Sequence, residues 1–275
     1  MTTFNQSDLW ALILGGSSGF GLASAKRLAQ SGLNLCIVHR DRRGAMGRIE
    51  EQFEEIRKEG VELKTFNINA LSPAGRKTVL DELVSAKLKG KVRLLLHSIA
   101  FGSLKLIAPE VSAEMSSSPH DSELLLDDEE LATTVYAMGT SLLSWTQELF
   151  RSELLAADAR IIGLTSEGNE VAWKGYAAVS AAKAALEALS RSIAKEFGPH
   201  GVRANIIQPG VTDTPALRMI PGNERLRSEA LHKNPLGRLT TVDDVAKVVL
   251  FMTSDEASWI NGSILRVDGG EHIAG

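Results

Sequence analysis

Short apolar runs alternate with longer amphipathic segments along most of the chain. The apolar runs, each short enough to be a single strand, are Leu9–Leu14, Leu33–Val38, Val61–Phe66, Val92–Leu96, Arg160–Leu164, Val202–Ile207 and Ser263–Val267. Segments of helical length between them include Gly21–Gln30, Ala45–Lys58, Arg76–Lys87 and Ala181–Phe197. Strands that are apolar on both faces and separated by helices indicate a parallel sheet covered by helices on both sides.

Seven strand-length runs account for nearly the whole chain of 275 residues. The pattern therefore predicts an α/β fold, a doubly wound Rossmann-type parallel sheet of seven strands, as a single domain over residues 1–275. Two segments interrupt the alternation. We expect residues 103–130 to be a polar, mobile insertion and residues 214–235, which contain three prolines, to be a substrate lid.

Charge and cysteine content narrow the function classes. The net charge is −4, which argues against a nucleic-acid-binding surface. The single cysteine, Cys36, excludes an internal disulfide and is typical of a reducing compartment. The first nine residues lack the basic start of a secretory signal, and the apolar run that follows is too short to span a bilayer. We expect a cytoplasmic protein with no membrane partner.

A glycine-rich loop follows the first predicted strand. It reads Gly15-Gly16-Ser17-Ser18-Gly19-Phe20-Gly21 and leads directly into a helical run. Gly15 permits a tight turn, Gly19 allows a phosphate near the backbone, and Gly21 lets the helix pack on the sheet. The amino-terminal end of the helix offers free N–H groups to a pyrophosphate. The loop, including Ser17, Ser18 and Phe20, predicts a dinucleotide site, with a ligand-free glycine turn as the alternative.

Residues at the end of the second strand indicate which dinucleotide binds. A carboxylate at position 39 would favour NAD, but the chain has His39 there, followed by Arg40. A guanidinium is suited to a 2′-phosphate, so we expect NADPH, with NADH as the alternative. Arg42 and Arg43 are equally well explained as solvated surface residues. Asn69, or less favourably Asn67, follows the third strand and is a candidate adenine contact or a turn former.

Several motifs resemble those of the short-chain dehydrogenase/reductase family, over almost the whole chain. They are the glycine loop, a later Tyr…Lys pair, Pro209-Gly210-Val211-Thr212-Asp213-Thr214 and Val267-Asp268-Gly269-Gly270. Most members of this family carry Tyr-x3-Lys, but four residues before Lys183 the chain has Val179. The nearby tyrosine is Tyr176, which gives Tyr-x6-Lys. This spacing, and His97-Ser98-Ile99-Ala100, resemble the NADPH-dependent enoyl-acyl-carrier-protein reductases.

A physical reason can be offered for the longer spacing. An enoyl reductase delivers hydride to C3 while charge develops on the thioester oxygen, which lies further along the substrate. The proton donor must therefore stand further from the nicotinamide than in a carbonyl reductase. Helix positions seven apart share one face, so Tyr176 and Lys183 can both face a cleft. This interpretation requires Tyr176 to lie at or just before the start of a helix.

The resemblance implies roles for particular residues. Tyr176 would stabilise and protonate the enolate, Lys183 would hold the nicotinamide ribose and favour release of the tyrosine proton, and Ser166 would bind the substrate oxygen. The residues implied in cofactor contact beyond the glycine loop are Ser98, Ile99, Ala100, Lys183, Pro209, Gly210, Val211 and Thr214. Tyr136 stands where many members have a structural asparagine; it is a candidate acid or, more simply, a packed helix residue.

The substrate is expected to be a thioester of acyl carrier protein or of coenzyme A. Segment 215–238 holds five basic and two acidic residues, an excess of three positive charges. That excess is either an ordinary solvated lid or a landing patch for an acidic carrier or for phosphates. Apolar residues in the segment are candidates for an acyl-chain slot: Leu217, Met219, Ile220 and Leu226. The histidines show no metal-ligand spacing, so no metal is expected. By resemblance, the chain would form a homotetramer.

Three functional hypotheses follow. The first is an NADPH-dependent enoyl-thioester reductase of fatty acid synthesis. The second is a carbonyl, 3-ketoacyl or hydroxysteroid-type reductase, which Ser166 supports and Val179 opposes. The third is a non-catalytic NADP-binding regulator, against which Tyr176 and Lys183 argue.

Overall fold

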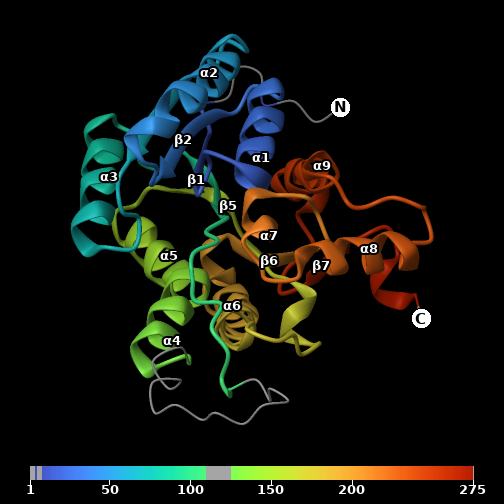
Figure 1. Ribbon diagram of the computed structural model, residues 1–275. Coiled ribbons are helices and arrows are strands. Elements are labelled where there is room, and N and C mark those ends of the chain that lie inside the picture. The colour runs from blue at the N-terminus through green and yellow to red at the C-terminus, as the bar shows by residue number, and fades with distance from the viewer. Residues whose placement is uncertain (1–3, 5–7, 110–124, 275) are drawn as a thin grey trace.

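The computed structural model describes Phe4 and residues 8–109 and 125–274, and its centre is a parallel sheet (Figure 1). Within these residues the strands are β1 (Trp10–Leu14), β2 (Asn34–His39), β3 (Leu63–Asn67), β4 (Val92–His97), β5 (Leu155–Leu164), β6 (Val202–Pro209) and β7 (Ile264–Val267). They pair in the order β3-β2-β1-β4-β5-β6-β7. The predicted doubly wound, seven-stranded Rossmann-type fold is therefore confirmed.

Helices cover both faces of the sheet (Figure 1). One face packs against α1 (Gly19–Gln30), α2 (Met46–Arg57) and α9 (Val242–Thr253). The other packs against α3 (Pro73–Ser85), α5 (Ser141–Arg151) and α6 (Ala177–Glu196). All five residues of β1 are buried, because a central parallel strand is covered on both sides. This double burial is the reason that the strands appear in the sequence as continuous apolar runs.

The strand order reverses next to β1, and this reversal positions the site. Strand β1 lies between β2 and β4, and the connection after β1 runs to β2 on one side while the connection after β4 runs to β5 on the other. Gly15 follows β1 and donates its N–H to the Val38 carbonyl at 2.8 Å, while the Ser98 N–H after β4 donates to the Leu14 carbonyl at 2.9 Å. The two loops thus begin side by side, at the crevice where doubly wound sheets bind ligands.

Helix starts differ from the sequence prediction at several places. Helix α1 begins at Gly19 instead of Gly21, and α6 begins at Ala177 instead of Ala181. Helix α3 begins at Pro73 because the Ser72 hydroxyl accepts a hydrogen bond from the Gly75 N–H at 3.0 Å.

The predicted polar insertion, 103–130, has described residues at both of its ends. Residues 110–124 lie outside the described residues. The acidic run that ends the segment is not irregular, because Asp127 caps α4 (Asp128–Val135) in a capping box with Glu130. Helix α4 continues through a π-helical turn, Tyr136–Thr140, into α5.

The predicted lid, 214–235, contains two helices after β6. They are α7 (Pro215–Arg218) and α8 (Asn223–Lys233). No helix in the described part of the chain has the length and apolar character needed to cross a membrane.

Candidate active site

A cavity of about 780 Å³ opens at the carboxyl ends of the strands, within the size range of small-molecule sites. Its wall includes Tyr176, Lys183 and Ser166. It also includes nearly all the predicted cofactor residues: Gly15, Ser17, Ser18, Gly19, Phe20, Arg40, Asn69, Ser98, Ile99, Ala100, Pro209, Gly210, Val211 and Thr214. Gly21 is the exception. A Cβ there would lie 2.2 Å from the Gly15 carbonyl oxygen, so Gly21 serves the packing of α1 on the turn.

The glycine loop has the geometry of a phosphate cradle. Gly15 and Gly19 have φ angles of 85° and 53°, a region that residues with a side chain rarely adopt. Gly19 faces Thr214 across the cavity, where a Cβ would stand 3.8 Å from the Thr214 Cγ2 and fill part of the space. The first turn of α1 carries no acidic residue. Its N–H groups and positive dipole end therefore fit a pyrophosphate.

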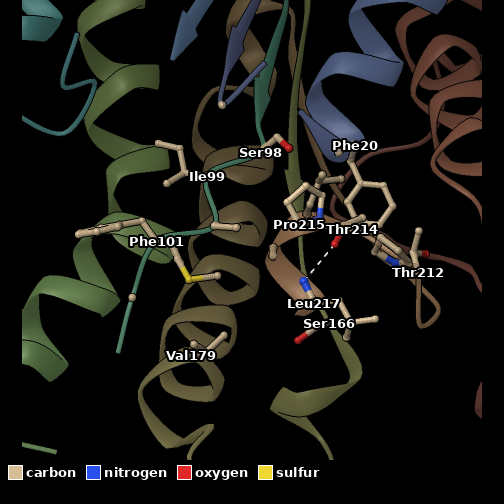
Figure 2. A pocket seen from close by; sticks show the side chains of 18 of the residues that line it. Phe20, Ser98, Ile99, Phe101, Ser166, Val179, Thr212, Thr214, Pro215 and Leu217 are labelled. Atoms are coloured by element: carbon tan, nitrogen blue, oxygen red, sulfur yellow. Dashed lines mark hydrogen bonds between the residues drawn. The ribbon is translucent and has the colours of Figure 1, made fainter. Parts of the chain in front are cut away.

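Figure 2 shows how these loops surround the cavity. Phe20 lies beside Thr214 and Thr212 on one side, and Ile99 and Phe101 lie across from them. Thr214 caps α7, because its hydroxyl accepts from the Leu217 N–H at 3.2 Å, the bond drawn dashed in Figure 2. This cap fixes the start of α7 beside the glycine loop.

The loop after β2 forms the end of the cavity where a 2′-phosphate would lie. The Arg40 guanidinium carbon stands 4.5 Å from the centre of the Phe101 ring. His39 is buried, and its Nδ1 lies 2.8 Å from an Asp41 carboxylate oxygen. Both Arg40 and Asp41 line the cavity, whereas the exposed Arg42 and Arg43 do not. Arg40 is thus the arginine of this run that is placed to meet the ligand.

The structure also distinguishes the two asparagine candidates. Asn69 lines the cavity, and its side chain accepts from the Leu71 N–H at 3.1 Å. Asn67 instead exchanges hydrogen bonds with the backbone of Asp41, at 2.9 and 3.1 Å, and does not line the cavity. Asn67 therefore fixes the loop after β2.

Tyr176 and Lys183 share one face of α6. Tyr176 is the residue immediately before the helix, as the longer spacing requires, and its hydroxyl lies 3.1 Å from the Ser166 hydroxyl. The Lys183 ammonium donates to the Leu164 carbonyl at 2.7 Å. Both side chains line the cavity, and both are more than nine-tenths buried, so they are largely shielded from solvent.

Burial shifts the pKa values of Tyr176 and Lys183 in opposite directions. Burial raises the pKa of the Tyr176 phenol, and the hydrogen bond from Ser166 only partly opposes it. The pKa of Tyr176 therefore lies above its usual value in this structure, because loss of water is the larger effect. Burial lowers the pKa of Lys183 to about 8, and the Glu187 carboxylate opposes that change.

Val179 occupies the usual tyrosine position and lines an apolar part of the cavity (Figure 2). It packs in one buried cluster with Tyr176 and Met138. Partly buried apolar residues complete the cluster: Leu71, Leu104, Val135, Trp173 and Ile220. An apolar wall beside a phenol suits a hydrocarbon chain attached to a polar reacting group.

Tyr136 lies outside this cavity. Its hydroxyl accepts from an Arg76 nitrogen at 2.5 Å and donates to the Leu71 carbonyl at 3.1 Å. Arg76 is buried and also contacts Glu148 at 3.2 Å. Tyr136 therefore holds α3 to the π-helical turn, which agrees with the packed alternative and leaves Tyr176 as the phenol in the cavity.

Three of the four apolar residues expected in an acyl-chain slot line the cavity. Leu217, Met219 and Ile220 line it, whereas Leu226, on α8, does not.

The arginines of segment 215–238 have carboxylate partners, which reduce the net positive charge of the predicted basic patch. Arg218 and Arg227 both pair with Asp213, at 2.8 and 3.3 Å. Arg225 pairs with Glu229 and Arg238 with Asp244. Counting Asp213 and Asp244 lowers the local excess from three positive charges to one.

Two carboxylates near the site were missed in the sequence. Glu271, in the last turn, lines the cavity and accepts from the Val211 N–H at 3.2 Å. Glu187 lies behind Lys183 and accepts hydrogen bonds from Thr165 and Asn169. Burial raises the pKa of Glu271. No local pattern marks either residue, because their partners lie far away in sequence or on the next element. Among the residues described, no three His, Cys, Asp or Glu side chains group as metal ligands.

Comparison with known proteins agrees with this geometry. A family model described as Enoyl-(Acyl carrier protein) reductase matches residues 15–272. The uncharacterized oxidoreductase YjdA of Bacillus subtilis (strain 168) is 31% identical over 262 residues, which cover 94% of this chain and 95% of that protein. The 3-oxoacyl-[acyl-carrier-protein] reductase FabG of Escherichia coli (strain K12) is 27% identical over 263 residues, covering 96% of this chain and 97% of FabG.

A solved structure has the same fold. Enoyl-[acyl-carrier-protein] reductase (NADH) from Aquifex aeolicus VF5 superposes with a TM-score of 0.78 at 25% identity, and the match covers 97% of this chain and 98% of that one. With a family model matched over nearly its whole length, with the strand order of the fold and with Tyr176 and Lys183 in one cavity, the chain belongs to the short-chain dehydrogenase/reductase family and is an oxidoreductase.

Proposed function

We propose that this protein is an NADPH-dependent enoyl-thioester reductase, which reduces the C2–C3 double bond of a trans-2-enoyl thioester. The observation that carries the proposal is the position of the phenol. Tyr176 stands at the start of α6, seven residues before Lys183, while Val179 fills the usual tyrosine position with an apolar side chain. A proton donor at this position suits the thioester oxygen of the substrate, which lies further from the nicotinamide than C3, the carbon that receives the hydride.

The protein residues divide the work as follows. A bound nicotinamide supplies the hydride. Tyr176 keeps its proton because burial raises its pKa, so it can donate a hydrogen bond to the thioester oxygen as negative charge develops there. Ser166 orients the phenol, and the Lys183 cation adds positive potential from behind. The same phenol can then protonate the enolate.

Arg40 supports NADPH as the reductant. Its guanidinium lines the cavity beside the glycine loop and is held against the Phe101 ring, which leaves its N–H groups for a phosphate. Asp41 also lines the cavity, and a carboxylate suits the free ribose of NADH. The relative from Aquifex aeolicus is described with NADH, so NADH is the alternative.

The acyl carrier is proposed as acyl carrier protein or coenzyme A. The apolar wall formed by Met138, Val179 and Ile220 would hold the acyl chain near Tyr176. FabG acts on acyl-carrier-protein substrates by its description, which supports a thioester substrate here.

A homotetramer in the cytoplasm is proposed as the working form. Ala181, Ala184 and Ala188 are exposed along α6 and would allow another helix to approach closely. Ala182, on the same helix, is buried inside the chain against Gly139. Light scattering on purified protein measures the assembly directly.

A 3-oxoacyl reductase is the second candidate. It is favoured by Ser166, which lies in the cavity 3.1 Å from the phenol, and by the likeness to FabG. A non-catalytic NADP-binding regulator is the third. The buried Tyr176 and Lys183, both facing the cavity, argue for catalysis.

One assay separates these functions. Loss of NADPH absorbance is followed with crotonyl thioester, acetoacetyl thioester and a panel of ketones. We expect turnover of crotonyl thioester, with Tyr176→Phe lowering kcat by about 10²–10³-fold, the usual effect of removing one such donor. Tyr136→Phe, which changes the other tyrosine, should keep its kcat. No turnover of any enoyl thioester would refute the proposal, and full activity of Tyr176→Phe would refute the assignment of the acid.

A further inference from the structure

A buried carboxylate, Glu187, lies directly behind the catalytic pair without lining the cavity. It stands on α6 four residues after Lys183, so the two side chains lie on the same face, one turn apart. Its side chain is more than nine-tenths buried. A carboxylate loses much favourable hydration on burial and is retained only where hydrogen bonds and positive charge compensate.

Glu187 holds both ends of the loop that carries Ser166. Its Oε1 accepts from the Thr165 hydroxyl at 2.5 Å and from the Asn169 side-chain nitrogen at 2.6 Å. Between these residues, Gly168 packs so closely on Tyr176 that a Cβ would lie 2.3 Å from the ring. The loop that Glu187 fixes therefore contacts the phenol through Ser166 and supports its ring through Gly168.

Lys183 and Glu187 bind successive residues at the end of β5. Lys183 donates to the Leu164 carbonyl at 2.7 Å, and Glu187 accepts from the side chain of Thr165. One cationic and one anionic side chain of α6 thus each form a hydrogen bond with the end of β5. The anion also compensates a cation that is itself almost wholly buried.

We propose that Glu187 is a positioning residue for the reaction. It sets the Ser166 loop against α6 through Thr165 and Asn169, and it supplies the counter-charge that keeps Lys183 a cation. The proposal rests on Tyr176 and Lys183 being the catalytic pair, and it holds for an enoyl or a carbonyl substrate alike.

The groups around Lys183 determine the sign of the expected pH effect. His97 on β4 is neutral, since burial and the nearby Lys183 lower its pKa to about 3. Tyr176 is neutral because burial raises its pKa. Glu167, in the turn after Ser166, stands 3.6 Å from His272. Glu187 is the carboxylate that opposes the effect of burial on the pKa of Lys183, so removing its charge must lower that pKa.

The test is Glu187→Gln, which keeps the size of the side chain and an oxygen to accept from Thr165 and Asn169. The Lys183 side-chain signal is followed by NMR against pH in the protein without substrate, and is assigned by its loss in Lys183→Met. We expect the titration of Lys183 to move down by about one pH unit, the usual effect of losing an adjacent opposite charge. The basic limb of the kcat profile should move with it, giving about tenfold lower kcat at pH 9.

Three further variants separate the effect of the Glu187 charge from the effect of its hydrogen bonds to the Ser166 loop. Thr165→Val removes one hydrogen bond without changing charge, so kcat should fall while the Lys183 titration stays in place. Glu187→Ala should show both effects. Glu196→Gln, an exposed glutamate on the same helix, should show neither.

An unchanged Lys183 titration in Glu187→Gln would overturn the proposal, whatever the stability of the variant. Failure of the enoyl assay is a separate result, because the Lys183 titration needs no substrate. The two proposals can therefore fail independently.

Discussion

The spacing between Tyr176 and Lys183 has its physical basis in where α6 begins. Tyr176 immediately precedes the first helical residue of α6, and from there its hydroxyl reaches the Ser166 hydroxyl. Val179, one turn closer to Lys183, points into the same cavity but has no proton to give. A change of three positions along the chain therefore moves the acid without moving the lysine.

We expect a single arginine, Arg40, to determine the preference for NADPH over NADH. Arg40→Ala removes the guanidinium that lies over Phe101 in the cavity wall. A hydrogen bond to a charged group contributes about 1.5–3 kcal/mol, so we expect the Kd for NADPH to rise about 10- to 100-fold while the Kd for NADH changes little. Fluorescence titration with both dinucleotides measures this. Arg43→Ala, an exposed neighbour, is the control, and an equal loss for both dinucleotides would contradict the assignment.

The buried His97 makes stability depend on pH. Its Nε2 lies 2.8 Å from the Ser141 hydroxyl, and its pKa is lowered to about 3. An unfolded histidine titrates near pH 6.5, so below that value the unfolded chain binds one more proton than the folded chain. The contribution to stability is therefore fully present above about pH 6.5. It declines as the pH falls towards 3, by at most about 1.4 kcal/mol per pH unit.

Urea unfolding between pH 5 and 7.5 measures this dependence. The variant His97→Gln keeps a side-chain donor for Ser141 but cannot titrate, so its unfolding free energy should vary less with pH than that of the natural chain. His200→Gln, at an exposed position, should leave the dependence as it is. The same slope in His97→Gln and the natural chain would assign the dependence to other groups.

At the scale of elements, the sequence predicts what is repeated locally and misses what depends on distant partners. The central strands are found because burial on both faces leaves a continuous apolar run, as in β1 and β4, and the edge strands β3 and β7 are found although they are only partly buried. The starts of α1 and α6 are missed because glycine and alanine residues carry no strong capping signal. In the site, the residues that line the cavity can be predicted because they come directly after the strands. Glu271 could not be predicted, because its partner Val211 lies 60 residues away and no local sequence pattern links the two.

The π-helical turn before α5 is the element that sets α6 in place. The Ser141 N–H reaches back to the Tyr136 carbonyl, and its hydroxyl donates to the Ala137 carbonyl. Gly139 in this turn packs on the backbone of α6, where a Cβ would lie 2.5 Å from the Ala182 carbonyl oxygen. Ala182 immediately precedes the catalytic lysine, so the fit of this turn affects the active site.

Gly139→Ala is therefore expected to separate the two helices. Overpacking of this kind usually costs about 1–3 kcal/mol, and kcat should fall as well because Lys183 shifts with its helix. Denaturant unfolding and the reductase assay measure the two effects. Gly47→Ala is the matched control, because it lies in α2 with nothing within 4 Å of the added Cβ and should stabilise the protein by about 0.5–1 kcal/mol. Equal behaviour of the two variants would show that the turn has room for a side chain.

At the scale of the whole molecule, charge decides how an acidic carrier would approach. The chain has a net charge of −4, so a carrier protein of the same sign is repelled on average. The lid has a small local excess of positive charge, within which Arg225 is strongly exposed and pairs with Glu229 on its own helix. Lys233, at the end of α8, is also exposed. These two cations are the ones best placed to attract a carrier, since Arg218 and Arg227 share Asp213.

The double variant Arg225→Gln, Lys233→Gln tests whether the lid receives a carrier. For an enoyl group on acyl carrier protein we expect KM at low salt to rise about 3- to 10-fold, because charges at the rim of an interface act mainly on the encounter rate. KM for the same enoyl group on N-acetylcysteamine should not change, since that small thioester has no surface to dock. The matched control is Lys77→Gln, Lys89→Gln, which removes two exposed and ion-paired lysines away from the lid. A rise in KM for both substrates would place the effect in the acyl slot, and no rise for either would leave the lid charges without a role in docking.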